Sequence, residues 1–105
     1  MLCASRDFNF TIIRKRNKLI VAVKDRLDSL TAPKIQEQLE AELKGIEKII
    51  FDFAELNYIS SAGLRLLLTA MQVMEEQGEM VVRNVTPAVM DVFEITGFIN
   101  DLTIE

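Results

Sequence analysis

Two adjacent serines, Ser60 and Ser61, are the side chains of this sequence best placed to do chemistry. They lie between the apolar run 49–53 and the residues Ala62-Gly63-Leu64, where a buried strand should give way to a helix. A hydroxyl at such a junction can cap the helix, accept a phosphoryl group or act as a nucleophile. A nucleophilic serine on this kind of turn needs a glycine two residues earlier and a histidine base. The chain has Ile59 at that position and no histidine, so a hydrolase is not expected.

The composition argues against several other functions. Without histidine there can be no Ser-His-Asp or Cys-His catalysis and no histidine-based metal site. No glycine-rich phosphate loop is present, and the 16 Asp and Glu residues include no pair marked out by its spacing. A net charge of −4 disfavours nucleic-acid binding, which requires a basic surface. We therefore predict a binding protein rather than an enzyme, with no cofactor, no metal and no nucleic-acid partner.

Local spacing favours Ser60 as the helix cap and leaves the hydroxyl of Ser61 free. With Ser60 as the N-cap, Ile59 and Leu64 occupy the two hydrophobic staple positions. With Ser61 as the N-cap, those positions would be polar. Gly63 falls in the first turn, where glycine is costly. Either close packing of the helix against a strand or the approach of a partner's backbone explains it equally well.

Apolar spacing predicts the elements that hold these serines. Strands are expected over residues 8–13, 19–23, 49–53 and 80–82, with a last short strand within residues 98–104. The basic residues between the first two strands are expected to form a solvated hairpin turn. Three helices are expected between residues that can cap a helix and glycines that can end one: Thr31 to Gly45, Ser60 to Gly78, and Thr86 to Gly97.

The expected order is β-β-α-β-α-β-α-β, an α/β fold in a single domain over residues 1–105. Strands interleaved with helices imply a mixed β-sheet backed by helices. The unbroken apolar run 49–53 implies a central strand covered on both faces. At the helix starts, Leu30 is expected to staple onto Ile35 after the Thr31 cap, and Val85 onto Met90.

Several features favour a protein made and kept in the cytoplasm. Cys3 is the only cysteine, so no disulfide can form within the chain. The N-terminal residues do not follow the signal-peptide pattern, and no apolar stretch approaches the roughly 18 residues that a membrane span requires. Direct membrane insertion is therefore not expected. One core accounts for the apolar stripes, so the free protein is expected to be a monomer.

The strand-to-helix segment also resembles a family signature. In the STAS family, named for sulphate transporters and anti-sigma-factor antagonists, a buried strand and a short turn lead to Asp-Ser-Ser/Ala-Gly-Leu at a helix start. Here that motif reads Ser60-Ser61-Ala62-Gly63-Leu64. Further matches follow in the family's order over nearly the whole chain, at residues 26–32, 78–82, 86–89 and 96–98. The resemblance implies the STAS fold and a small, single-domain anti-sigma-factor antagonist.

The resemblance implies a phosphorylation switch centred on Ser61. In such family members, the serine after the motif's Asp is phosphorylated by a partner anti-sigma factor that is a serine kinase. A serine phosphatase of the PP2C type resets the switch. The motif's Asp is replaced here by Ser60, which is therefore an alternative acceptor. The partner-binding surface implied by the resemblance comprises Asp28, Ser29, Ser60, Ala62, Gly63 and Arg65.

Two alternatives stay open at this point. Asp28 can equally form an Asx-turn that leads into the Thr31 cap. The chain can also be a STAS interaction subunit with no phosphorylation cycle, such as a cytoplasmic accessory of a lipid or anion transporter.

Overall fold

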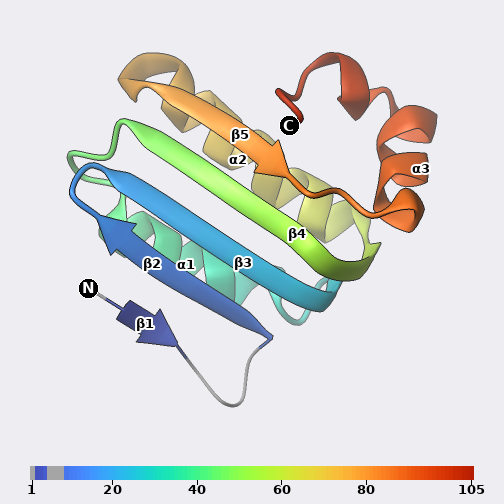
Figure 1. Cartoon of the computed structure of the whole chain (residues 1–105), viewed down its shortest axis with the longest axis horizontal. Coiled ribbons are helices and arrows are strands. Elements are labelled where there is room, and N and C mark those ends of the chain that lie inside the picture. Colours follow the sequence, from blue (N-terminus) through green and yellow to red (C-terminus); the bar gives the residue numbers. More distant parts are fainter. Residues whose placement is uncertain (1, 5–8) are drawn as a thin grey trace.

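Five strands form one sheet in the order β1-β2-β3-β4-β5 (Figure 1). The computed structural model describes residues 2–4 and 9–105. The first three strands pair antiparallel, whereas β3, β4 and β5 pair in parallel. The predicted mixed sheet is therefore confirmed. The strands are β1 (Leu2–Ala4), β2 (Phe10–Lys15), β3 (Lys18–Leu27), β4 (Lys48–Ile59) and β5 (Glu79–Arg83).

Helices cover one face of this sheet. α1 (Ala32–Glu42) and α2 (Ser61–Gln77) lie behind it in the view of Figure 1, and α3 (Pro87–Thr96) follows β5 to one side. A short 3-10 helix, η1 (Phe98–Asn100), comes after α3. The core between the helices and the sheet includes fully buried side chains from strands and helices alike, such as Phe51, Leu67 and Phe93. None of the helices among the described residues is long and apolar enough to cross a bilayer.

The predicted N-terminal hairpin is confirmed. β2 and β3 are joined by the exposed two-residue turn Arg16–Asn17, so the turn is solvated as predicted, although the other basic residues of this run lie in the two strands. Phe8, at which the first strand was expected to begin, lies outside the described residues. β1 was not predicted. A strand of only three residues is too short to show an alternating apolar pattern in the sequence. In the structure it is recognised by its pairing with residues 11–13 of β2.

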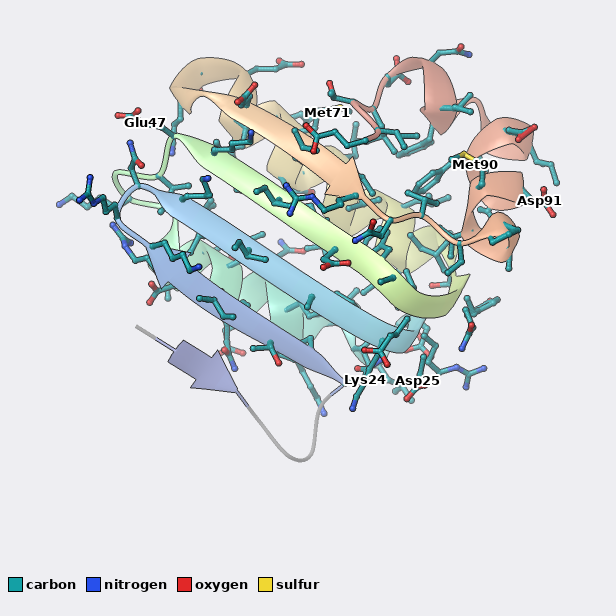
Figure 2. All side chains as sticks on the ribbon, viewed as in Figure 1. Lys24, Asp25, Glu47, Met71, Met90 and Asp91 are labelled. Atoms are coloured by element: carbon teal, nitrogen blue, oxygen red, sulfur yellow. The ribbon has the colours of Figure 1, made fainter. Side chains whose placement is uncertain are left out.

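β4 carries two bulges where it passes β3, so both strands run further than their apolar runs indicated. Ala22 pairs with Asp52, but Lys24 pairs with Glu55, and the register shifts again between Asp25 and Arg26. Each shift inserts one extra residue into β4. Figure 2 shows Lys24 and Asp25 near the end of β3, where both are exposed. Bulges of this kind break the two-residue alternation, which is why the sequence pattern ended these strands too early.

The prediction that the central strand is covered on both faces is wrong. No described helix packs on the face of the sheet that is turned to the viewer in Figure 1. Ile50 lies on that open face and is nevertheless only 2% exposed. Its register partners are Ile20 on β3 and Val81 on β5. Cross-strand neighbours, rather than a second layer of helices, therefore cover Ile50.

The expected last strand is reduced to a single bridge. Residues 98–104 begin with η1, and only Ile104 pairs with the sheet, at Val82. The backbone of Val82 donates to Thr103 and accepts from Glu105, both at 2.9 Å. The turn after α3 places Leu102 in the core, with 9% of its surface exposed. Burial of Leu102, rather than strand pairing, orders this segment.

Gly78→Ala should destabilise the fold by about 3 kcal/mol or more, because overlap with backbone cannot be relieved by a side-chain movement. A Cβ at Gly78 would collide with the carbonyl oxygen of Glu47, which accepts the N–H of Glu79 at 3.0 Å. Urea denaturation measures the loss. Gly97→Ala is the control, since open space surrounds Gly97 and only its φ of 82° opposes a side chain. Its cost should be nearer to 1 kcal/mol. If Gly78→Ala loses no more unfolding free energy than Gly97→Ala, a Cβ at position 78 does not collide with the backbone of Glu47.

Candidate functional site

The ends of β3 and β4 bring two helix starts together at one edge of the sheet. Leu27 and Ile59 are the last residues of these strands and are register partners. The backbone N–H of Ser60 donates to the carbonyl oxygen of Leu27 at 2.9 Å. The loop that leads into α1 is thus tied to the junction that leads into α2. The two segments predicted to form the site, around Asp28 and around Ser61, start from this one bonded pair of strand ends.

Ser60 and Ser61 occupy the positions predicted for them, but the expected capping bond is not made. α2 begins at Ser61, and Ser60 is the extended residue before it, with its carbonyl oxygen accepting the N–H of Leu64 at 3.0 Å. The Oγ of Ser60 is buried and finds no hydrogen-bond partner in the part of the chain that the structure describes. The side chain of Ser61 is exposed. Ser61 therefore presents the hydroxyl that another protein can reach.

Gly63 is required by close packing beneath this junction. A Cβ at Gly63 would lie 2.7 Å from Cγ1 of Ile59 and 2.9 Å from both Cγ and the carbonyl oxygen of Leu27. Real Cβ atoms do not approach a backbone oxygen that closely, so any side chain would push α2 away from the strand ends. Of the two explanations open from the sequence, packing of helix against strand accounts for this glycine. Gly63 is itself buried.

α1 begins directly after Thr31, as predicted, but the side chain of Thr31 makes no bond that caps the helix, and Asp28 caps this turn instead. Oδ1 of Asp28 accepts the N–H groups of Leu30 at 2.9 Å and of Thr31 at 3.2 Å. Oγ1 of Thr31 accepts the N–H of Asp28 at 3.0 Å, which completes a reciprocal capping box. Thr31 already has helical backbone angles, so it lies inside the turn. The Asx-turn expected as an alternative at Asp28 is confirmed.

The same hydrogen bonds hold the pKa of Asp28 below its ordinary value. The N–H of Leu30 has the largest effect, and the N–H of Thr31 and the nearby guanidinium of Arg26 act in the same direction. Partial removal from water opposes them. Nε of Arg26 lies 3.6 Å from Oδ2 of Asp28. Asp28 is therefore a fixed negative charge at this edge of the sheet at neutral pH.

Two exposed apolar side chains at this edge were missed from the sequence. Leu30 is 75% exposed, so its predicted staple onto Ile35 is wrong: with Asp28 as the cap, Leu27 takes the position before it. Tyr58 is 48% exposed, and the guanidinium carbon of Arg26 lies 5.5 Å from the centre of its ring. Tyrosine and arginine are the residue types that most often dominate binding energy at protein interfaces. The sequence signal that could have identified Tyr58 as an interface residue is an aromatic side chain two positions before Ser60.

The remaining predicted site residues surround the serines at different depths. Ser29 and Arg65 are exposed, whereas Ala62 is half-buried. Between α1 and α2 runs a groove of about 320 Å³, and the structure brings Ala62 and Arg65 together on one of its walls. The wall from α1 carries two carboxylates, Glu37 and Glu40. The groove is therefore lined by small apolar side chains together with positively and negatively charged ones.

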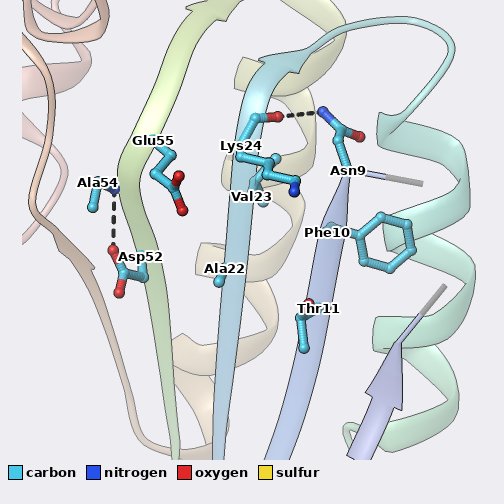
Figure 3. Close-up of a pocket in the computed structure, with 9 residues that line it drawn as sticks. All are labelled: Asn9, Phe10, Thr11, Ala22, Val23, Lys24, Asp52, Ala54 and Glu55. Atoms are coloured by element: carbon cyan, nitrogen blue, oxygen red, sulfur yellow. Dashed lines mark hydrogen bonds between the residues drawn. The ribbon is translucent and has the colours of Figure 1, made fainter. Parts of the chain in front are cut away.

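A separate hollow of about 250 Å³ lies on the open face of the sheet and contains neither serine (Figure 3). Small side chains of neighbouring strands, among them Thr11, Ala22 and Ala54, leave the space open. Asp52 lines it, but its Oδ1 already accepts the N–H of Ala54 at 3.1 Å. No group of three or more acidic or cysteine side chains in the described ranges is arranged to hold a metal ion. The hollow adds no reactive group to the serine site.

Comparison with known proteins gives a consistent family. Residues 9–105 match the model of the STAS domain. The chain is 40% identical over 84 residues to BtrV of Bordetella bronchiseptica, a candidate anti-sigma factor antagonist, covering 78% of this chain and 72% of that protein. It is 30% identical over 86 residues to the anti-sigma-B factor antagonist of Listeria monocytogenes, covering 80% and 75%.

Solved structures share the fold. The anti-sigma factor antagonist SpoIIAA of Bacillus superposes with a TM-score of 0.74 in its unphosphorylated and its phosphorylated form. The sequence identities are 20% and 21%, and each match covers 91% of this chain. The matches cover 86% and 90% of the SpoIIAA chains. At that identity the likeness concerns the fold, and it agrees with the predicted strand and helix order.

Ser60→Ala should change the free energy of unfolding by less than about 0.5 kcal/mol, because no capping bond is lost and a buried, unpaired hydroxyl is removed. This replaces the loss of about 1 kcal/mol that a side-chain cap would imply. Urea denaturation, with Ser61→Ala measured beside it as the exposed neighbour, tests the expectation. A loss above about 1 kcal/mol for Ser60→Ala alone would show that its hydroxyl does cap α2.

The stability supplied by Asp28 should depend on pH. Its pKa is lowered in the folded protein, so its contribution is complete above the ordinary value of 3.8 and is lost as the pH falls through the folded pKa. Asp28→Asn keeps an oxygen that can cap but does not titrate. Thermal unfolding between pH 7 and pH 3 should show the variant losing less stability than the wild type at the acidic end. If the difference in stability between the wild type and Asp28→Asn stays constant from pH 7 to pH 3, the ionised carboxylate of Asp28 does not stabilise the fold.

Proposed function

The chain belongs to the STAS domain family, and on that premise we propose that it is an anti-sigma factor antagonist controlled by phosphorylation of Ser61. The observation that carries the proposal is the exposed hydroxyl of Ser61, which begins α2 and takes no part in capping. The unphosphorylated protein binds an anti-sigma factor that is a serine kinase, and this binding releases the sigma factor. The relatives named as anti-sigma factor antagonists support this choice of partner.

The surface around Ser61 suits a protein partner. Leu30 and Tyr58 are large apolar side chains left in water, and Arg26 stacks on the ring of Tyr58. Burying such groups against a partner releases apolar surface from water, and aromatic and arginine side chains often carry most of the affinity. Asp28 adds a fixed negative charge, which favours a partner with a positive charge at the facing position and disfavours a negatively charged one. The partner surface therefore includes Leu30, Tyr58 and Arg26 in addition to Asp28, Ser29, Ala62 and Arg65.

Two electrostatic effects act on a phosphate at Ser61, and they differ in size. In the free domain the phosphate lies at the positive end of α2, which should stabilise it by something like 0.3–2 kcal/mol. At a contact surface shaped for a hydroxyl, the phosphate brings nearly two negative charges that must lose water. An unmatched charge at such a surface costs several kcal/mol, and about 1.4 kcal/mol is a tenfold loss of affinity. Binding is therefore lost while the domain stays folded.

The reaction is supplied by other proteins of the cytoplasm. The partner kinase transfers the terminal phosphoryl group of its own ATP to Oγ of Ser61, so that ADP is the leaving group and the catalytic base of the kinase accepts the hydroxyl proton. A serine phosphatase of the PP2C type removes the phosphate and resets the switch. This chain contributes a surface and an acceptor hydroxyl. Ser60 is a poor second acceptor, because its Oγ is buried.

Phosphorylation of Ser61 should weaken binding to the cognate anti-sigma kinase by about a hundredfold or more, without unfolding the domain. Ser61→Ala should bind constitutively, and Ser61→Asp should imitate the phosphate in part, since a carboxylate carries a single charge. Calorimetric titration of the cognate anti-sigma kinase with unmodified and with phosphorylated protein measures the difference in affinity.

Ser60→Ala provides the matched control, because it should still be phosphorylated and released. Matching affinities of the two forms, or a phosphorylated form that melts well below the unmodified one, would contradict the switch. Binding without any transfer of phosphate to Ser61 would favour the interaction subunit that has no phosphorylation cycle.

A further inference from the structure

Arg65 is an exposed cation one helical turn beyond Ser61. Its backbone carbonyl accepts the hydroxyl of Thr69 at 3.0 Å, as in an ordinary helix. Its guanidinium makes no ion pair with any residue of the described ranges. An exposed arginine without an ion-pair partner contributes little to the stability of the folded state, and little stability is lost when its side chain moves. This side chain is free to respond to a new charge nearby.

The helix brings Arg65 within reach of Ser61. Residues four apart on a helix have Cβ atoms about 5–6 Å from each other and share one face. Helical side chains lean toward the N-terminus, so the side chain of Arg65 leans over the turn that contains Ser61. Both side chains are exposed, and Ala62 and Arg65 line the same groove wall. A group attached to Oγ of Ser61 is therefore on the same exposed side of α2 as the guanidinium of Arg65.

We infer that Arg65 is a positioning residue that clamps the phosphate when Ser61 is phosphorylated, an inference that rests on the proposed function. A guanidinium presents two parallel N–H donors that match two phosphate oxygens, which a lysine ammonium does not. The clamp would hold the phosphate along α2, at a fixed place on the partner surface. It would also stabilise the phosphorylated domain.

Competition from carboxylates is weak at this position. Glu37 and Glu40 face Arg65 across the groove, but each has a single charge and neither lies within ion-pair distance of the guanidinium. A phosphoserine carries nearly two charges and three acceptor oxygens. The first turn of α2 contains no acidic residue, and Ser60 stands where the family motif has Asp. The phosphate therefore meets no neighbouring carboxylate on its own helix, and it outcompetes those on α1.

The test uses phosphoserine inserted at position 61 during translation, so that it needs no kinase. Thermal unfolding is measured for the unmodified and phosphorylated forms of the wild type, Arg65→Gln, Arg65→Lys and Arg83→Gln. Phosphorylation should raise the melting temperature of the wild type by about 2–4 °C more than that of Arg65→Gln, and high salt should remove the difference. Phosphorus NMR should show the phosphate of Arg65→Gln losing its last proton at a higher pH than that of the wild type.

The other two variants separate a clamp from a general charge effect. Arg83→Gln removes the same charge from another element, at the C-terminal end of β5, where Arg83 pairs with Glu105 at 3.6 Å. It should respond to phosphorylation like the wild type. Arg65→Lys should recover only part of the effect, because it keeps the charge without the paired donors.

Equal responses of the wild type and Arg65→Gln, in melting and in NMR, would overturn the inference even if a kinase phosphorylates Ser61. A measured clamp in a protein that no kinase phosphorylates would instead overturn the proposed function alone.

Discussion

The parallel pairing of β3 with β4 up to their last residues is the contact on which the rest of the structure depends. Leu27 and Ile59 end the two strands as register partners, and the N–H of Ser60 bonds to the carbonyl oxygen of Leu27. From this point β3 continues into the loop of Asp28, and β4 continues into α2. Gly63 packs against the same two residues, so α2 is seated directly on the strand ends. The loop of Asp28 and the start of α2 are therefore held by one shared support.

This arrangement separates structural from functional polar groups within a few residues. Asp28 and Thr31 bond to each other's backbone and fix the loop, and Asp28 still presents its charge. Ser60 bonds through its backbone to Leu27 and Leu64, whereas its neighbour Ser61, the first residue of α2, has an exposed side chain. A modification of Ser61 can therefore change what binds without changing what holds the domain together.

The sequence predicted those parts of the fold that depend on local periodicity. The strand before Ser60, the helix after it and the exposure of Ser61 follow from apolar spacing and staple positions, and the structure agrees. The start of α1 could not be predicted as well, because the cap Asp28 and the candidate Thr31 are both good capping residues and only the backbone conformation chooses between them. The exposure of Tyr58 and Leu30 depends on bulges and on that cap, so apolar spacing alone assigned them wrongly or not at all.

The two bulges in β4 have a further consequence for how this segment can vary in length. Val21 pairs with Phe51, and Leu27 pairs with Ile59, and all four side chains are buried. Six residue steps separate the pairs along β3 and eight along β4. The buried side chains of β4 follow one another at a step of two from Phe51 to Phe53, but at steps of three across the bulges, to Leu56 and then to Ile59. Each bulge therefore takes up one extra residue and still returns the next apolar side chain to the core, so this segment can change in length by a single residue without reversing the strand end that leads into α2.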